Sequence, residues 1–200
     1  MLVQFRRALI VAALAVASLA AGPARAELVA GGDTAFRSAL NACIEQFAAA
    51  GGETAEIAEI LRHPRPRSRR HTIQPPPEGM NGNNTQPTNG LEGFRNRGRP
   101  GQGSGTNIFW DPNDRAPFPD GTLRDPCVSL IHEFQHALDF QNGVGDPSPH
   151  GVVPGFVPTS VPEGEVRACR AENRFRAART PPLPQRRNWR GLPLPSNAIF

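Results

Sequence analysis

Two histidines and a glutamate in the second half of the chain have the types and the spacing of a zinc-hydrolase site. His132, Glu133 and His136 form an H-E-x-x-H pattern. On a helix, residues four apart lie one above the other, so both imidazoles can bind one cation at the zinc–nitrogen distance of about 2.0–2.1 Å. Glu133 then points beside the metal, where it can take a proton from a metal-bound water. The pattern therefore predicts one Zn²⁺ per chain, with Glu133 as catalytic base and not as ligand.

A catalytic zinc site needs a third protein ligand, and the sequence offers four candidates. They are His150, Glu163, Glu165 and Glu172. The residues after His136 do not continue as H-x-x-G-x-x-H, which disfavours a third histidine close behind the motif. His150 also lies in a turn rich in proline and glycine. Glu165 and Glu172 are seven residues apart and share one face of a helix, but the residues alone leave the third ligand open.

The motif positions its side chains only if the segment is helical, and its neighbours predict a helix from Pro126 to about Gln141. Asp125 is a favourable N-cap, and proline suits the first helical position. Asn142-Gly143 then provides the stop. A second helix is predicted over Glu163–Ala178 and would hold the candidate glutamates rigidly.

The remaining pattern predicts an α+β fold. A helical segment spans Asp33–Leu61 with a break at its Gly-Gly pair, and β-favouring runs predict strands at His71–Gln74 and Thr106–Trp110. Most of 63–105 is rich in Pro, Gly, Asn and Arg and is predicted to be a long irregular loop. Residues 27–200 are expected to form a single domain. The strand at 106–110 can pair with an extended substrate by edge addition, and the alternative is a purely structural strand.

Four segments together resemble a known family, the M91 zinc metallopeptidases. These are NleD-like bacterial effector proteases whose active sites are similar to those of the clostridial neurotoxin light chains. The segments are His132–Ala137, Asn142-Gly143, Glu165–Ala168 and Glu172–Arg176, within a likeness that runs roughly from residue 33 to 189. Many families share H-E-x-x-H, so its combination with E-x-R-A and E-N-x-x-R makes the resemblance specific.

The resemblance implies a small zincin-like metallopeptidase domain with short β-strands, long Pro/Gly-rich loops and a gluzincin-like site. The third ligand is then Glu165, which precedes a hydrophobic residue and an arginine. Glu172 then either packs the helix or supports the ligands, and it can hold Arg176 at i+4. Independently of the resemblance, Asp139 lies one turn after His136 and can either hold a ligand histidine or face solvent.

The family pattern also has an Arg-x-x-Tyr near its end, whose side chains stabilise the transition state. This chain has Arg186-Arg187-Asn188-Trp189 and no tyrosine at all. The resemblance therefore implies Arg186 or Arg187 as the catalytic arginine and places Trp189 where the family has tyrosine. An indole N–H is expected to be the weaker oxyanion donor, so this change affects catalysis and not metal binding.

The first 26 residues have the form of a Sec-type secretory signal, unlike the effectors of the family. Arg6 and Arg7 precede an apolar run that ends in a small-x-small site, so cleavage is predicted after Ala26. The protein is expected to be secreted or periplasmic without stable membrane insertion; an uncleaved membrane anchor is the alternative. Cleavage leaves 19 arginines against 18 acidic residues. These arginines are spread along the chain, which argues against a nucleic-acid partner.

The predicted export favours a disulfide among the three cysteines, because thiols outside the cytosol tend to be oxidised. One bridge and one free thiol are expected. A Cys127–Cys169 bridge would tie the two ligand-bearing helices together, and Cys43 is the alternative partner for either.

These observations predict a zinc metalloendopeptidase that hydrolyses peptide bonds of a protein or peptide substrate. Glu133 accepts a proton from the metal-activated water and passes it to the leaving amine. Zinc and Arg186 or Arg187 stabilise the oxyanion. The first alternative is a non-catalytic exported zinc-binding or interaction protein, against which the retained Glu133 argues. The second is a disulfide-stapled binding module with a coincidental motif, which chance produces in under about 1% of such chains.

Overall fold

The computed structural model describes residues 28–62, 70–80, 82–96, 98–117, 121, 124–146 and 160–200. The predicted secretory signal and the candidate ligand His150 lie outside these ranges. Among the residues described, no helix has the length and apolar character needed to cross a bilayer.

Helices and short strands are mixed along the chain, which confirms the predicted α+β class. The elements are β1 (Leu28–Ala30), α1 (Thr34–Ala50), α2 (Gly52–Arg62), β2 (His71–Gln74), β3 (Asn84–Pro87), α3 (Gly90–Gly93), β4 (Thr106–Phe109), α4 (Pro126–Gln141), α5 (Glu163–Ala178), β5 (Asn188–Trp189), β6 (Leu192–Pro193) and the 3-10 turn η1 (Ser196–Ala198). The predicted motif helix, the predicted glutamate-bearing helix and both predicted strands are therefore present.

The main sheet has the order β1-β2-β4-β3, so β4 is an inner strand. β1, β2 and β4 are parallel, whereas β3 runs antiparallel to β4 with Thr85 opposite Ile108. The expected pairing of the 106–110 strand with a substrate is wrong, because β2 and β3 occupy both of its edges. The long loop expected over 63–105 also needs correction, since β3 and α3 lie within it. Apart from Leu91 their residues are polar, glycine or proline, and they show no hydrophobic period, which explains why the pattern missed them.

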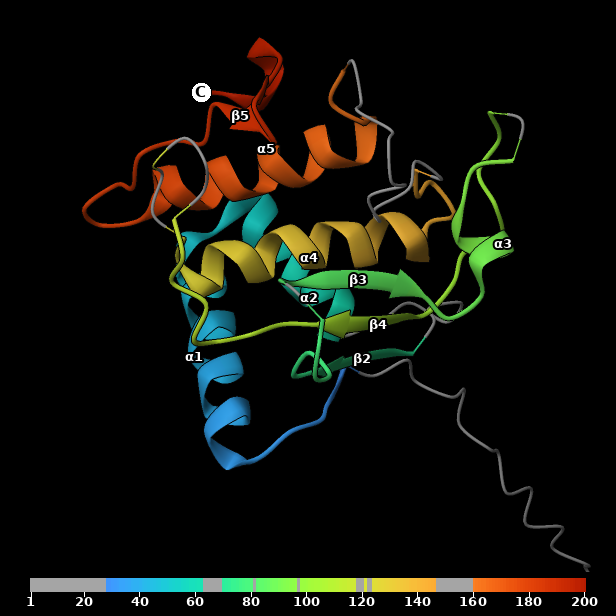
Figure 1. The fold of residues 1–200 in the computed structure, drawn as a ribbon, viewed down its shortest axis with the longest axis horizontal. Helices are drawn as coiled ribbons and strands as arrows, with labels where there is room; N and C mark the ends of the chain where they lie inside the picture. The colour runs from blue at the N-terminus through green and yellow to red at the C-terminus, as the bar shows by residue number, and fades with distance from the viewer. Residues whose placement is uncertain are drawn as a thin grey trace, which may run out of the picture.

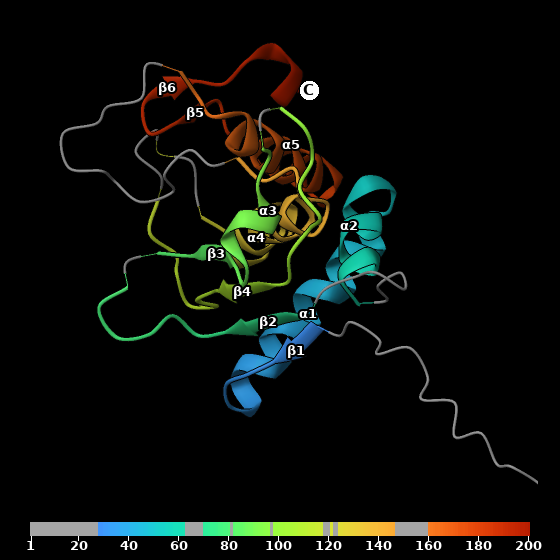
Figure 2. The same ribbon diagram turned by 90° about the vertical axis from the view of Figure 1, so that its right-hand side faces the viewer.

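The motif helix α4 lies between α5 and the sheet (Figure 1). Figure 2 shows α1 and α2 side by side on one flank of the sheet. The buried ring of Phe47 on α1 makes edge-to-face contacts with Phe134 on α4, at 5.9 Å, and with Phe175 on α5, at 5.0 Å. Such contacts add about 0.5–1.5 kcal/mol beyond area burial, so they fix the motif helix α4 and the glutamate-bearing helix α5 against a common support.

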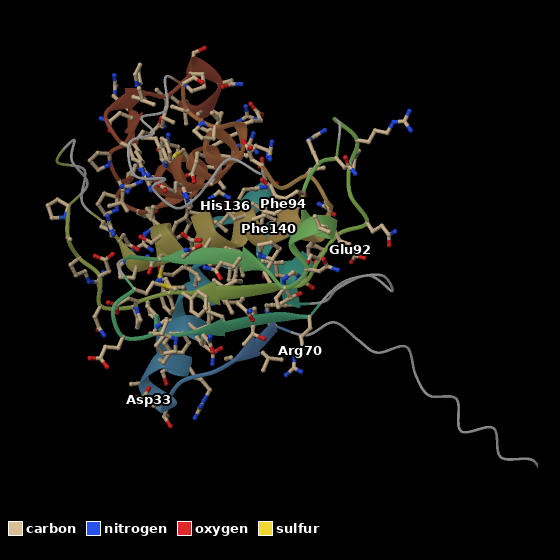
Figure 3. The ribbon with its side chains drawn as sticks, turned by 45° about the vertical axis from the view of Figure 1, so that its right-hand side comes forward. Asp33, Arg70, Glu92, Phe94, His136 and Phe140 are labelled. Carbon is tan, nitrogen blue, oxygen red and sulfur yellow. A yellow bond between two sulfur atoms is a disulfide. The ribbon has the colours of Figure 1, made fainter. Side chains whose placement is uncertain are left out.

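The segment between β3 and β4 packs against the last turn of α4 and forms a hydrogen bond with it. Phe94 meets Phe140 edge to face at 5.4 Å (Figure 3). The Ser104 N–H donates to the carbonyl of Phe140 at 2.9 Å, and the Gly103 N–H donates to that of Glu92 at 2.9 Å. Gly103 has a φ of 90°, and a Cβ there would meet the carbonyl oxygen of Gln141 at 2.0 Å, so the close approach requires glycine.

The disulfide joins Cys43 on α1 to Cys127 at the start of α4, with a Cα–Cα distance of 5.1 Å. The expected Cys127–Cys169 bridge is therefore wrong, and Cys169 is a buried free thiol. The reason is the packing of the helices: Cys43 lies on the buried face of α1, which contacts α4. Cys169 instead lies deeper along α5, where its thiol is near His132.

Candidate metal centre

The first turn of α4 forms as predicted. The Asp125 side chain accepts hydrogen bonds from the backbone N–H groups of Cys127 at 2.8 Å and Val128 at 3.2 Å. One and a half turns later, His132 and His136 project from the same face. Their Nε2 atoms are 3.1 Å apart and their rings meet edge to face at 4.7 Å. The predicted pair of imidazoles is therefore brought together.

Glu165, in the first turn of α5, completes a three-residue group with these histidines. Its carboxylate oxygens lie 3.2 Å from Nε2 of His132 and 3.6 Å from Nε2 of His136. These three side chains can hold a metal ion. Glu163 is not part of the group: its side chain is 74% exposed and lies 3.6 Å from Arg167.

Glu172 lies behind His132 and is almost fully buried. One carboxylate oxygen lies 2.7 Å from Nδ1 of His132 and accepts a hydrogen bond from the Arg186 guanidinium at 2.8 Å. The other faces Nε of Arg176 at 3.9 Å. Burial by itself raises the pKa of Glu172, but Arg186 and His132 outweigh burial and lower that pKa to about 2. Glu172 therefore supports the site as a carboxylate.

A second group of possible donors shares His132. It adds the Cys169 thiol and Glu172 to the imidazole, with ligand atoms within 4.8 Å of one another. The Arg186 guanidinium already supplies the positive charge beside Glu172, so this group is a poorer cation site. Burial by itself lowers the pKa of His132, but contacts with the Cys169 thiol and two carboxylates outweigh burial and hold that pKa well above its ordinary value.

The residues His132, His136 and Glu165 are called the metal group below. Glu133 lies beside this group and is 6% exposed. One oxygen of its carboxylate accepts a hydrogen bond from the Thr85 hydroxyl at 2.7 Å, and the same hydroxyl lies 3.2 Å from the Glu133 carbonyl. Thr85 belongs to β3, the strand that the sequence pattern missed. Its contact with Glu133 spans 48 residues, so no local signal could have indicated it.

Asp139 is buried and does not face solvent. Its carboxylate accepts hydrogen bonds from Gln135 at 2.8 Å and from Nε of Arg167 at 2.9 Å. Burial raises the pKa of Asp139 in spite of the neighbouring guanidinium. Because Arg167 comes from α5, this ion pair ties the two helices together near the metal group.

A cleft of about 320 Å³ opens in front of the metal group. Arg186 and Trp189 both line it, whereas Arg187 is exposed and lies outside the lining. Of the two candidate arginines, the structure thus brings only Arg186 to the cleft. The β5–β6 hairpin forms one wall, where the guanidinium of Arg190 lies over the ring of Trp189 at 4.9 Å from its centroid.

Comparisons of the chain with protein-family models, with curated proteins and with solved structures give no match.

Proposed function

We propose that the protein is a zinc-dependent metalloendopeptidase with a zincin-like fold. The observation that carries this proposal is the convergence of His132, His136 and Glu165, with Glu133 beside them at an open cleft. A site that only stabilises the fold would need no acidic residue in that position. The antiparallel edge strand β3, packed over the motif helix, supports the zincin-like interpretation.

The donor set fits a zinc ion. In a tetrahedral site with bonds of about 2.0–2.1 Å, ligand atoms are separated by about 3.3 Å. The separations among the three residues are 3.1, 3.2 and 3.6 Å. Two imidazoles and one carboxylate also form the set that catalytic zinc uses when a fourth position stays open for water or substrate.

Zinc, when bound, acts as a Lewis acid and makes a water acidic near neutral pH. Glu133 takes the proton from the attacking water and passes it to the leaving amine. The Thr85 hydroxyl holds the Glu133 carboxylate in one orientation. Glu172 orients His132 from behind, as a carboxylate does for a ligand histidine. The indole N–H of Trp189 has no acceptor among the described residues, and we assign it and Arg186 to the oxyanion.

The substrate that suits this cleft is an extended peptide. Among the described residues β3 pairs with β4 only, so its other edge is open to a further strand. Main-chain hydrogen bonds to such an edge give affinity without sequence specificity. We therefore place the extended substrate against β3 and not against the 106–110 strand. The Cys43–Cys127 bridge suits an oxidising compartment, in agreement with secretion or a periplasmic location.

A non-catalytic zinc-binding protein is the second candidate, and one observation favours it. The Arg186 guanidinium donates to Glu172 at 2.8 Å and to the carbonyl of Asn188 at 2.9 Å, so part of its donor capacity is already used. Trp189 stands where the family pattern has tyrosine. These two residues weaken oxyanion stabilisation and leave the metal donors intact.

The test combines metal analysis with a peptide-cleavage screen on the zinc-loaded protein. Glu133→Gln should retain one zinc per chain and lose about 10²–10⁴-fold in cleavage rate, because the general base is removed. Glu163→Gln makes the same chemical change at an exposed position and should behave as the unmodified protein. Absence of stoichiometric zinc, or full turnover in Glu133→Gln, contradicts the proposal. Stoichiometric zinc without cleavage of any peptide selects the non-catalytic candidate.

A further inference from the structure

The turn that joins β5 to β6 has an unusual residue in it. Trp189 pairs with Leu192, so Arg190 and Gly191 form a two-residue hairpin turn. Both have positive φ, 49° and 83°, as a type I′ turn requires. Asn, Asp or Gly is preferred at the first of these positions, and an arginine there costs conformational energy. A strained residue of this kind suggests a role for its side chain.

The side chain of Arg190 is held at the cleft. Its guanidinium lies over the Trp189 ring, and both residues line the same cleft as the metal group. A cation over an indole face is attracted by the negative face of the ring, which favours this position of the guanidinium. Among the residues that the structure describes, Arg190 makes no ion pair. Its charge therefore lies at the cleft without a carboxylate partner from the described part of the chain.

The other charges of the cleft are compensated. Arg186 pairs with Glu172, and Arg124 pairs with Asp114. The carboxylates of Glu165 and Glu133 act on the metal and on the attacking water in the function proposed above. Arg190 is thus the cation of the described lining that has no assigned counter-charge.

We propose that Arg190 forms an anion subsite, so the protein prefers peptides that carry a carboxylate close to the scissile bond. This inference rests on the proposed peptidase function. The carboxylate can be an Asp or Glu side chain or a free C-terminus, since a guanidinium binds both in the same bidentate way. Trp189 supports the subsite by fixing the guanidinium and does not itself recognise the charge.

The test measures peptide binding to zinc-loaded Glu133→Gln by calorimetry, so that no turnover interferes. Three peptides with blocked termini differ only in having Glu, Gln or Lys beside the scissile bond, and a fourth is the Gln peptide with a free C-terminus. We expect the Glu peptide to bind about 1.5–5-fold more tightly than the Gln peptide, and the Lys peptide more weakly than either, as for a partly exposed ion pair. Preference for the fourth peptide instead of the first would identify the C-terminal carboxylate as the ligand.

Adding Arg190→Glu should reverse the order, so that the Lys peptide binds best, with zinc content unchanged. Arg70→Glu makes the same charge change at an exposed position away from the cleft and should leave the order as it was (Figure 3). An unchanged order in Arg190→Glu, equal affinity for all peptides, or no binding overturns the inference. Failure of the peptidase proposal is detected by a separate measurement, because the protein with Glu133 intact would then cleave no peptide in the screen.

Discussion

At the scale of single residues, the two nitrogens of His132 have different partners. Nε2 faces His136 and Glu165, whereas Nδ1 lies 2.7 Å from Glu172. A carboxylate behind a ligand histidine fixes its tautomer and its orientation. In the proposed site the two glutamates of α5 therefore have separate tasks, Glu165 towards the metal and Glu172 towards the imidazole.

This division predicts two levels of loss in zinc affinity. Glu172→Gln should weaken zinc binding by about 10–100-fold, the usual effect of removing the partner of a ligand histidine. Glu165→Ala should weaken it further, because a ligand itself is lost. Competition with a chromogenic chelator measures both, and Glu163→Ala is the matched control on the exposed side of the same turn. Zinc binding that survives in Glu165→Ala but disappears in Glu172→Gln would reverse the two assignments.

The protonation of His132 predicts how zinc binding depends on pH. The pKa of His132 is held well above its ordinary value by the Cys169 thiol and two carboxylates, which favours the protonated imidazole in the metal-free protein. Zinc must displace that proton, so its affinity should increase as the pH rises towards the raised pKa. Calorimetry in buffers of different ionisation enthalpy should detect proton release when zinc binds at neutral pH. No dependence on the buffer would show that the site binds zinc without deprotonation.

At the scale of elements, the site depends on the contacts that hold the two ends of α4. The Cys43–Cys127 bridge joins its first turn to α1, and Phe94 packs on Phe140 in its last turn. Between them, the Asp139–Arg167 pair links α4 to α5. The part of α4 that carries His132 and His136 is thus held by contacts with α1, with the segment before β4 and with α5.

Removal of the bridge should destabilise the protein. The bridge closes a loop across 84 residues, and loss of a native disulfide of this kind costs about 2–5 kcal/mol. Urea unfolding of Cys43→Ser should show that loss, while a reducing agent should have no further effect on the variant. Peptide mapping without reduction gives the independent check, since a bridge that contains Cys169 would contradict the structure.

At the scale of the whole molecule, the C-terminal segment returns to α5 and completes the site. Asn173 on α5 accepts a hydrogen bond from the backbone N–H of Arg186 at 2.7 Å and donates to its carbonyl at 2.9 Å. It also donates to the carbonyl of Ala198 at 2.7 Å. These contacts bring Arg186 to Glu172 and place the β5–β6 hairpin over the cleft.

The buried Arg186–Glu172 pair should therefore stabilise the folded protein as well as hold Arg186 in place. Arg186→Met leaves a buried carboxylate without its partner, which costs about 3–5 kcal/mol at neutral pH. Urea unfolding measures that loss, and the double variant with Glu172→Gln should recover part of it, because the carboxylate that Arg186 paired with no longer carries a charge. An Arg186→Met protein as stable as the original would show that the pair contributes little.

The pH dependence of the pair has a definite sign. The pKa of Glu172 is lowered from 4.5 to about 2 in the folded protein. The folded state therefore gains stability from this carboxylate above pH 4.5 and loses it as the pH falls towards 2. Between those pH values the original protein should lose stability more steeply than Glu172→Gln, which has no such group. Parallel urea-unfolding series across this range make the comparison.

The sequence by itself determined the parts of the protein that depend on neighbours in the chain. Asp125 and Pro126 start α4, and the spacing of His132 and His136 puts both imidazoles on one of its faces. The same local logic indicated α5 and its candidate glutamates. Each of these features follows from capping and helical periodicity within a few residues.

Only the tertiary structure decided which distant residues complete the site. Thr85 reaches Glu133 from a polar strand with no hydrophobic period, and Arg186 reaches Glu172 after the chain has turned back on itself. The choice of Cys43 as the bridge partner likewise follows from the packing of α1 on α4. These contacts join segments whose approach is set by the burial of helix and sheet faces, and that information is distributed over the whole core instead of lying in the local pattern.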